Sequence, residues 1–272
     1  NAISKVVEPL FKPNAGPIYY INISQDTFKL GGSAFGQVLN TIGSDTPNVQ
    51  SAAYVKTVFN TLQELIQNNK IVAGHDVASG GLITTLLELC FSGTNIGADL
   101  NFNALKEADS IKLLFSENPG IVFQATDTSI ETELSKTNIE FYNIGTVTNK
   151  AILNITNAAD TLALNVSHLR DVWYETSFLL DQKQTANGLA KDRFDNYKNQ
   201  PLSYKFPQQF TGKLPQLNLE NRPKAAIIRE KGSNSEREMA NAMYLAGFDV
   251  KDVHMTDLIS GRETLEDIQF IG

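Results

Sequence analysis

Two hydrophobic patterns alternate between residues 16 and 188. In short runs, β-branched, aromatic and aliphatic residues follow one another directly, which is typical of strands. Between these runs, hydrophobic residues recur every three or four positions, which predicts amphipathic helices. The runs predict strands at residues 18–23, 71–73, 121–125, 139–147, 151–156 and 161–166. The spaced positions predict helices at residues 51–68, 82–91 and 169–180.

This order of elements indicates the fold class. Strands and helices in mixed order favour an α/β protein, whose first domain is of the α+β kind, a mixed sheet covered by helices on one face. We expect this domain to occupy residues 1–190.

The next stretch, residues 191–221, shows no sustained hydrophobic period and contains three prolines. Such a composition predicts an extended, partly ordered linker. The alternative is a long loop packed on the first domain, because Leu202, Tyr204 and Phe206 alternate with polar residues and could pair as an edge strand.

A second pattern occupies residues 222–272. Ser233 and Glu236 have the spacing of a capping box, so we expect a helix to begin there. Gly247 suits the left-handed residue that ends such a helix. Strands are predicted at residues 224–229, 248–253 and 268–271. This βαβ order predicts the start of a doubly wound parallel sheet, which the chain does not complete.

Composition narrows the class of protein. Hydrophobic residues make up 42% and charged residues 19%, which is a globular composition. The net charge of -7 disfavours general nucleic-acid binding, because phosphates require a basic surface. No apolar run reaches the roughly 20 residues that a membrane span needs. The single cysteine, Cys90, lies in an apolar run and is better explained as a buried thiol than as a reactive one; a cytoplasmic location fits this usage.

The first candidate site is residues 74–81, between a predicted strand and an apolar helix. The adjacent Gly80 and Gly81 would let backbone amides approach an anion at the start of that helix. Asp76 offers the hard oxygen ligand that Mg²⁺ takes alongside phosphate oxygens. His75 could hydrogen-bond a phosphate or hold the loop. On composition alone, a structural turn with Asp76 as a cap and His75 as a half-buried side chain is the stronger interpretation.

Two further segments are weaker candidates. Residues 30–36 are rich in glycine and open a predicted helix, but they match no established phosphate-binding motif. A close-packed structural turn is the better explanation. Residues 114–120 end in a Pro-Gly turn before a strand. Glu117 could be a ligand there, although a solvated turn residue is the simpler interpretation.

Taken together and in this order, these segments resemble the large single-chain form of the phosphoribosylformylglycinamidine synthase family, from about residue 18 to the end. The most specific segments are residues 74–82, 114–120, 172–176 and 222–258. The residues that carry the first two segments are Gly74, His75, Asp76, Gly80, Gly81, Leu82, Leu114, Phe115, Ser116, Glu117, Pro119 and Gly120. The long run from Arg222 to Leu258 is the closest of all.

The resemblance implies a layout and an activity. Residues 1–190 would be a C-terminal-type synthetase domain of the aminoimidazole ribonucleotide synthetase kind, and residues 222–272 the start of a class I glutamine amidotransferase domain. The whole ligase of purine biosynthesis would convert formylglycinamide ribonucleotide, ATP and glutamine into formylglycinamidine ribonucleotide, ADP, phosphate and glutamate, with Mg²⁺ neutralising phosphate charge.

The resemblance also implies roles for single residues. Asp76 falls on the family's Mg²⁺-binding aspartate, and Gly80 and Gly81 fall on nucleotide-contacting positions. Ala78 replaces a usual serine that contacts the nucleotide, which reduces that contact to the backbone. Ser79 replaces a usual aspartate. The resemblance does not decide whether Asp76 serves the reacting or an auxiliary nucleotide. The glutaminase catalytic residues would lie beyond Gly272, so we expect this piece to be inactive by itself, with the remaining domains of the chain as partners.

Two rival functions stay open at this point. One is a free-standing relative, such as an aminoimidazole ribonucleotide or selenophosphate synthetase, against which the βαβ pattern after residue 224 argues. The other is a non-catalytic binding or scaffold module in which Asp76 is structural. Binding of ATP and Mg²⁺, compared with an Asp76→Ala variant, separates the enzyme from the scaffold.

Overall fold

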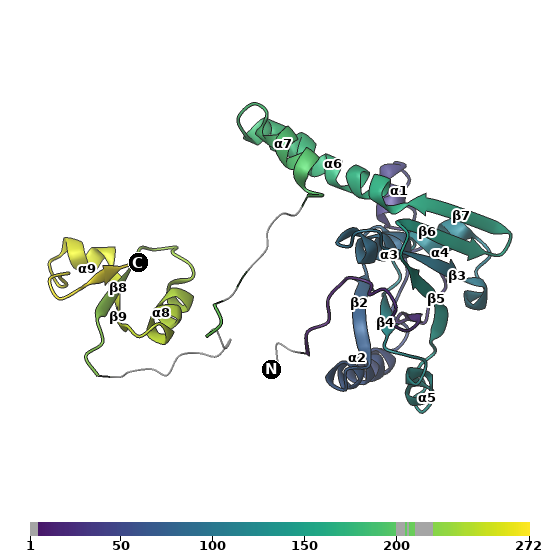
Figure 1. Cartoon of the computed structure of the whole chain (residues 1–272), viewed down its shortest axis with the longest axis horizontal. Coiled ribbons are helices and arrows are strands. Elements are labelled where there is room, and N and C mark those ends of the chain that lie inside the picture. The colour runs from purple at the N-terminus through teal and green to yellow at the C-terminus, as the bar shows by residue number, and fades with distance from the viewer. Residues whose placement is uncertain (1–4, 200–204, 206, 210–219) are drawn as a thin grey trace. The chain divides into compact units, whose positions relative to one another are not determined.

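A computed structural model describes residues 5–199, 205, 207–209 and 220–272. The chain divides into two compact units, Asn1–Gln200 and Pro201–Gly272, and each is described by itself (Figure 1). Leu202, Tyr204 and Phe206, which could have formed an edge strand, lie outside the described residues.

The first unit is built on a seven-stranded mixed sheet with the order β2-β4-β1-β5-β3-β6-β7. Its strands are β1 (Ile18–Asn22), β2 (Ile71–Val77), β3 (Gly97–Asn101), β4 (Gly120–Ala125), β5 (Tyr142–Thr148), β6 (Ile152–Asn157) and β7 (Asp160–Asn165). Only β3 and β6 pair in parallel; the other neighbours are antiparallel. The predicted strands and the mixed sheet are confirmed, whereas β3 was not predicted.

Helices connect these strands. They are α1 (Ala34–Val38), α2 (Ala52–Gln67), α3 (Gly81–Phe91), a short 3₁₀ helix η2 (Asn103–Leu105), α4 (Ser110–Phe115), α5 (Ile130–Leu134), α6 (Val166–Gln184) and α7 (Leu189–Asn196). The three long predicted helices correspond to α2, α3 and α6. Ser51 caps α2, because its side chain accepts a hydrogen bond from the backbone N–H of Tyr54.

Helices pack on both faces of the sheet, which corrects the expectation of one covered face. Successive residues of a strand point to opposite faces. In β1, Ile18 and Tyr20 join one hydrophobic cluster, whereas Tyr19 and Ile21 join another. The first cluster contains the buried residues of α3, and the second those of α2 and α5. The one-face expectation failed because the apolar stripe of α2 needs its own sheet face to be buried.

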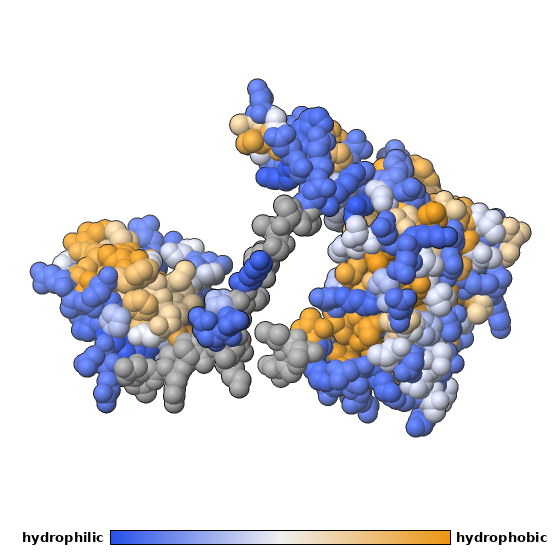
Figure 2. All heavy atoms as spheres, viewed as in Figure 1, coloured by the Kyte–Doolittle hydropathy of each residue, from blue (hydrophilic) through white to orange (hydrophobic). Residues whose placement is uncertain are grey.

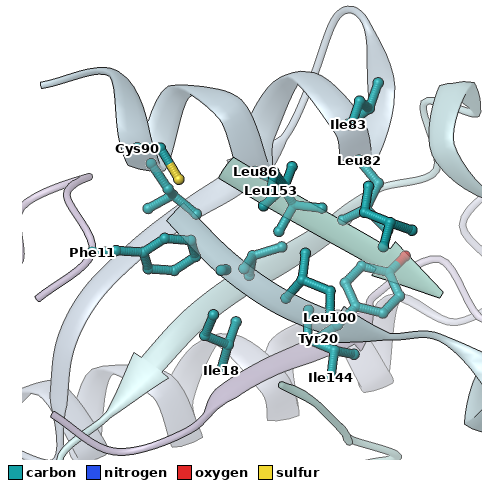
Figure 3. Close-up of a cluster of buried hydrophobic side chains, with 14 of the residues drawn as sticks. Phe11, Ile18, Tyr20, Leu82, Ile83, Leu86, Cys90, Leu100, Ile144 and Leu153 are labelled. Atoms are coloured by element: carbon teal, nitrogen blue, oxygen red, sulfur yellow. The ribbon is translucent and has the colours of Figure 1, made fainter. Parts of the chain in front are cut away.

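The largest cluster lies under α3. Figure 3 shows Leu82, Leu86 and Cys90 pointing from this helix toward strand residues that include Leu100 and Leu153. Leu86 and Cys90 are fully buried. This packing fixes α3, and with it the turn that precedes the helix.

The α6 and α7 helices form a hairpin at one end of the first unit (Figure 1). Phe178 of α6 stacks on Phe194 of α7, with ring centroids 4.6 Å apart. Residues 191–196 are therefore helical although they fall in the stretch interpreted as an extended linker. Isolated aromatic residues such as Phe194 supply the packing there, and they are too sparse to form a visible period. The domain boundaries at residues 190/191 and 221/222 stay a prediction.

The second unit has a three-stranded parallel sheet of order β10-β8-β9. Its elements are β8 (Lys224–Arg229), α8 (Glu236–Leu245), β9 (Asp249–His254), α9 (Met255–Ile259) and β10 (Phe270–Ile271). The predicted βαβ order and parallel pairing are confirmed. Figure 2 shows hydrophobic residues gathered at the surface of this unit. The exposed ones include Met239, Ile259, Phe270 and Ile271.

The predicted capping box of α8 is wrong in detail. The helix begins at Glu236 after Ser235, which has a left-handed conformation (φ 68°) and no capping hydrogen bond from its side chain. The Ser233 hydroxyl instead accepts from the backbone N–H of Glu230, which closes the turn after β8. Gly247 ends the helix region at φ +104°, as predicted.

Candidate functional site

The three candidate segments of the sequence meet at one carboxylate. Oε1 of Glu117 accepts a hydrogen bond from the backbone N–H of Ala34 and another from that of Gly80, both at 2.8 Å. Ala34 starts α1 and Gly80 precedes α3. Because a carboxylate is stabilised by N–H groups at helix starts, Glu117 acts as a clasp between the two helices.

The segment that carries Glu117 is itself firmly held. Asn118 is buried, and its Nδ2 donates to the Ser24 hydroxyl at 3.0 Å and to the Thr27 carbonyl at 3.0 Å. Ser116 is buried on the other side of Glu117. The interpretation of Glu117 as a solvated turn residue is therefore wrong. Its partners lie 37 and 83 positions away, so the local sequence carries no signal for them.

The glycine-rich segment at residues 30–36 forms a closed structural turn. The Ser33 side chain accepts from the backbone N–H of Gly36 and donates to the carbonyl of Leu30 at 2.6 Å. A Cβ on Gly31 would lie 2.5 Å from the carbonyl carbon of Asp45. The close-packed interpretation of this segment is supported. The hydrophobic residues after it do not form a buried face, since Val38 is strongly exposed.

Gly80 and Gly81 are required by their surroundings. Both have positive φ angles, +89° and +77°. A Cβ on Gly81 would lie 2.8 Å from the carbonyl oxygens of Leu114 and Ser116. The two amides also have acceptors inside the protein, because Gly80 donates to Glu117 and Gly81 donates to the carbonyl of Ala78 at 3.0 Å. A phosphate that accepted from Gly80 would have to replace the carboxylate of Glu117.

Asp76 lies within β2, because the strand continues to Val77 instead of ending at residue 73. This corrects the expectation that Asp76 occupies a strand-to-helix turn. Its side chain is 78% exposed, and its backbone carbonyl accepts from the Thr85 hydroxyl of α3 at 3.0 Å. The backbone of Asp76 is therefore fixed, and its carboxylate, whose Oδ1 lies 3.3 Å from Nδ1 of His75, remains exposed to a ligand.

His75 is a satisfied, half-buried side chain. Its Nε2 lies 3.1 Å from Oε2 of Glu88 on α3, and its Nδ1 lies 2.7 Å from the carbonyl oxygen of Asp76. The ring ties the edge strand β2 to α3. Of the two roles predicted for His75, the structure supports holding the loop.

Asp76 fits a magnesium ion only as one ligand of several. Among the described residues, no group of three His, Cys, Asp or Glu side chains could hold a metal ion. Mg²⁺ commonly takes one or two carboxylates and fills its remaining positions with phosphate oxygens and water. An exposed aspartate suits that arrangement.

The other candidate residues have structural roles. Cys90 is fully buried, and burial raises the pKa of its thiol to about 12, so it is not a nucleophile. His254 caps α9, because its ring nitrogen accepts from the backbone N–H of Thr256 at 3.2 Å. In the described parts of the chain, no helix is long and apolar enough to cross a membrane.

Two family matches cover most of this architecture. Residues 25–156 match the family described as AIR synthase related protein, C-terminal domain. Residues 222–272 match the CobB/CobQ-like glutamine amidotransferase domain. The first match contains all three segments that meet at Glu117, and the second coincides with the parallel sheet of the second unit.

Curated relatives align with nearly the whole chain. The probable phosphoribosylformylglycinamidine synthase of Arabidopsis thaliana, named as chloroplastic/mitochondrial, is 34% identical over 99% of the chain and 20% of its own length. Phosphoribosylformylglycinamidine synthase of Homo sapiens is 32% identical over 94% of the chain and 20% of its own length. The chain thus spans about a fifth of the curated relatives it matches.

Solved structures show a more distant likeness. Thermotoga maritima PurL complexed with ATP aligns with 62% of this chain and 28% of its own, at a TM-score of 0.47 and 15% identity. PurL complexed with FGAR aligns over the same share of this chain at a TM-score of 0.48 and 15% identity. From the two domain matches in order and the identities over nearly the full chain, this protein belongs to the phosphoribosylformylglycinamidine synthase family.

Proposed function

We propose that this chain forms part of an ATP-dependent ligase of purine biosynthesis, one that uses glutamine as its nitrogen donor. The whole enzyme would convert formylglycinamide ribonucleotide, ATP and glutamine into formylglycinamidine ribonucleotide, ADP, phosphate and glutamate. The observation that carries the proposal is the identity of 34% and 32% to named synthases over 99% and 94% of the chain. The chain also contains both domain types, the synthetase-related domain first and the amidotransferase domain second. A protein with only one of these domains would not account for both matches.

The reaction divides into two steps that this chain would share with the other domains of its enzyme. The amide oxygen of formylglycinamide ribonucleotide attacks the terminal phosphorus of ATP, and ADP leaves. Ammonia released from glutamine then adds to the activated carbon, and phosphate leaves. Because the chain covers a fifth of its relatives, we expect no turnover from the chain by itself.

Within this proposal, Asp76 supplies a carboxylate to Mg²⁺ on a bound nucleotide. Its strongly exposed side chain and anchored backbone support the assignment. The ion would neutralise phosphate charge. Ala78, Gly80 and Gly81 would contact the nucleotide through their backbone. Ala78 is exposed, whereas the amide of Gly80 already donates to Glu117.

The nucleotide assignment is tested by calorimetric titration of ATP with Mg²⁺ into the chain. We expect saturable binding that Asp76→Ala weakens by about tenfold or more, as for the loss of a charged ligand. The matched control is Asp249→Ala, an exposed aspartate of the second unit, which should bind as the parent chain does. Equal binding by the Asp76→Ala variant would remove Asp76 from the site.

The activity proposed for the whole enzyme is tested by building a chimera with a related synthase. Replacing the aligned fifth of the human synthase with this chain should preserve formation of formylglycinamidine ribonucleotide, whereas the same exchange with Gly81→Ala should reduce it. A folded, full-length chimera without activity would contradict the proposal even if the isolated chain bound ATP.

A scaffold function is the second candidate, because two observations favour it. The amides of Gly80 and Gly81 both have acceptors inside the protein. The described side chains also include no three-residue metal cluster. Under this alternative, the chain binds no ATP, and Asp76→Ala changes neither stability nor activity of the chimera.

A cytoplasmic location is also part of the proposal. It is supported by the use of a single, buried cysteine, which suits a reducing compartment. An organelle is the alternative, since the Arabidopsis relative is named as chloroplastic/mitochondrial. Imaging of the full-length protein with a tag at its C-terminus distinguishes the two.

A further inference from the structure

A cavity of about 840 Å³ lies beside α3, α6 and α7; its lining includes His75 but not Asp76, Gly80 or Glu117. Its lining comes entirely from the first unit. A volume between roughly 300 and 1,000 Å³ is typical of sites for small molecules. Neither the family matches nor the proposed function gives this cavity a role.

One wall of the cavity is aromatic. The rings of Tyr174 and Tyr197 stack 4.4 Å apart and are parallel to within 3°. Beside them, Trp173 packs at an angle against Phe91, with centroids 5.7 Å apart, and remains 52% exposed. An exposed indole ring that is fixed by aromatic neighbours offers a flat surface on which a planar ligand can stack.

The charged groups of the lining leave one cation without a carboxylate. Lys198 pairs with Asp171 at 2.6 Å, and His75 lies 3.1 Å from Glu88. Arg170 interacts with Tyr197, whose ring centroid lies 5.5 Å from the guanidinium carbon, and has no direct ion pair with a carboxylate in the described part of the chain. The cavity therefore carries a positive charge at Arg170.

Arg170 also has an unused donor. Its Nη1 donates to the carbonyl of Phe91 at 2.8 Å, which fixes the guanidinium. Its Nε is buried and has no hydrogen-bond partner among the described residues. A buried N–H without an acceptor is costly, so such a group indicates a missing acceptor. A guanidinium suits phosphate and carboxylate oxygens.

We propose that this cavity binds a planar aromatic anion, whose ring stacks on Trp173 and whose phosphate or carboxylate accepts from Arg170. The site differs from the one proposed at Asp76. The two sites adjoin, because Nδ1 of His75 lies 3.3 Å from Oδ1 of its neighbour Asp76. Only His75 lines the cavity. The contacts proposed here are with Trp173 and Arg170, so binding needs neither Asp76 nor Mg²⁺.

The chain reports on this site directly, because Trp173 is its single tryptophan. Adenosine monophosphate and 4-hydroxybenzoate, each titrated in EDTA, represent the phosphate and carboxylate forms of the ligand. We expect at least one of them to change Trp173 fluorescence saturably. Adenosine alone and inorganic phosphate alone should bind more weakly, by about tenfold or more. The tighter of the two probes identifies the anion. Saturation by neither would overturn the proposal.

Variants locate the binding. Arg170→Gln should weaken the binding about tenfold, whereas Asp76→Ala and the surface control Arg237→Gln should not change it. If Arg170→Gln unfolds, Trp173→Leu, followed by calorimetry, gives the same test at an exposed ring. Parent-like binding by a folded Arg170→Gln or by Trp173→Leu, or loss of binding in Asp76→Ala, contradicts the site. ATP binding with Mg²⁺ is measured separately, so a failure here leaves the proposed function intact.

Discussion

The two units of this chain use glycine for different reasons. Gly81 in the first unit has φ +77°, and a Cβ there would collide with carbonyl oxygens of residues 114 and 116. Gly247 in the second unit has φ +104°, and nothing lies within 4 Å of such a Cβ. Gly81 therefore serves a close approach between distant segments, whereas Gly247 serves a local turn.

The same contrast holds for the hydrophobic cores. The sheet of the first unit separates two clusters, which include fully buried side chains such as Leu86 and Phe123. The cluster of buried residues in the second unit consists of Ala225, Ile227 and Met243. Stability in the first unit thus depends on large buried side chains, and in the second on a small apolar contact.

The largest expected effect is on the first core. Leu86→Ala should lower the free energy of unfolding by about 2–5 kcal/mol, because it leaves a cavity under α3. Met243→Ala in the second unit should cost less. Denaturant unfolding followed by Trp173 fluorescence reports on the first unit.

The control for this comparison is Leu39→Ala, an exposed leucine, which should stay within about 0.5 kcal/mol of the parent chain. If Leu86→Ala cost no more than this control, the first unit would not depend on its α3 core.

The next comparison is between two glycines with positive φ angles, Gly81, which is packed closely against other residues, and Gly188, which is not. Gly188→Ala places a side chain at φ +91° with open space around it and should cost about 1–2 kcal/mol. Gly81→Ala should cost about 1–3 kcal/mol more, because it also collides with residues 114 and 116. Equal losses for the two variants in thermal unfolding would show that the contact at Gly81 is unimportant.

A smaller effect is expected at the clasp. Glu117→Ala leaves the N–H groups of Ala34 and Gly80 without their acceptor and should cost about 1–3 kcal/mol. Glu117→Gln keeps a carbonyl acceptor and should cost less. Hydrogen exchange should quicken at these two amides in Glu117→Ala but remain unchanged in Glu238→Ala, which alters an exposed glutamate of α8. Unchanged exchange in Glu117→Ala would disprove the clasp.

The smallest effect on stability near neutral pH is expected from the tyrosine Tyr20, because its hydroxyl titrates only at high pH. Burial raises the pKa of the Tyr20 hydroxyl above its ordinary value of 10.0. As the pH rises, the unfolded chain therefore loses this proton before the folded chain does. The contribution of Tyr20 to the free energy of unfolding is complete below pH 10.0 and declines as the pH rises above that value. Tyr20→Phe should lose less stability than the parent chain above pH 10.0. Parallel curves of stability against pH for Tyr20→Phe and the parent chain would refute this linkage.

Much of the fold was predictable because its signals are local. The helices α2 and α3 and the strands β1, β4, β6 and β8 all follow from hydrophobic spacing over a few residues. Short elements such as β3 and α7 were missed, since the packing that forms them comes from distant residues. The capping box at Ser233 failed because its hydroxyl accepts from the backbone N–H of Glu230, on the strand side of the turn.

For the candidate site, the sequence by itself determined which residue types are present: an aspartate, two adjacent glycines and a glutamate before a Pro-Gly turn. Only the tertiary structure decided that Glu117 joins Ala34 to Gly80 and that Arg170 faces an aromatic cavity. Hydrogen bonds and ring contacts of this kind act over a few ångströms in space, whatever the separation along the chain. Local patterns therefore specify the elements, and long-range packing specifies the site.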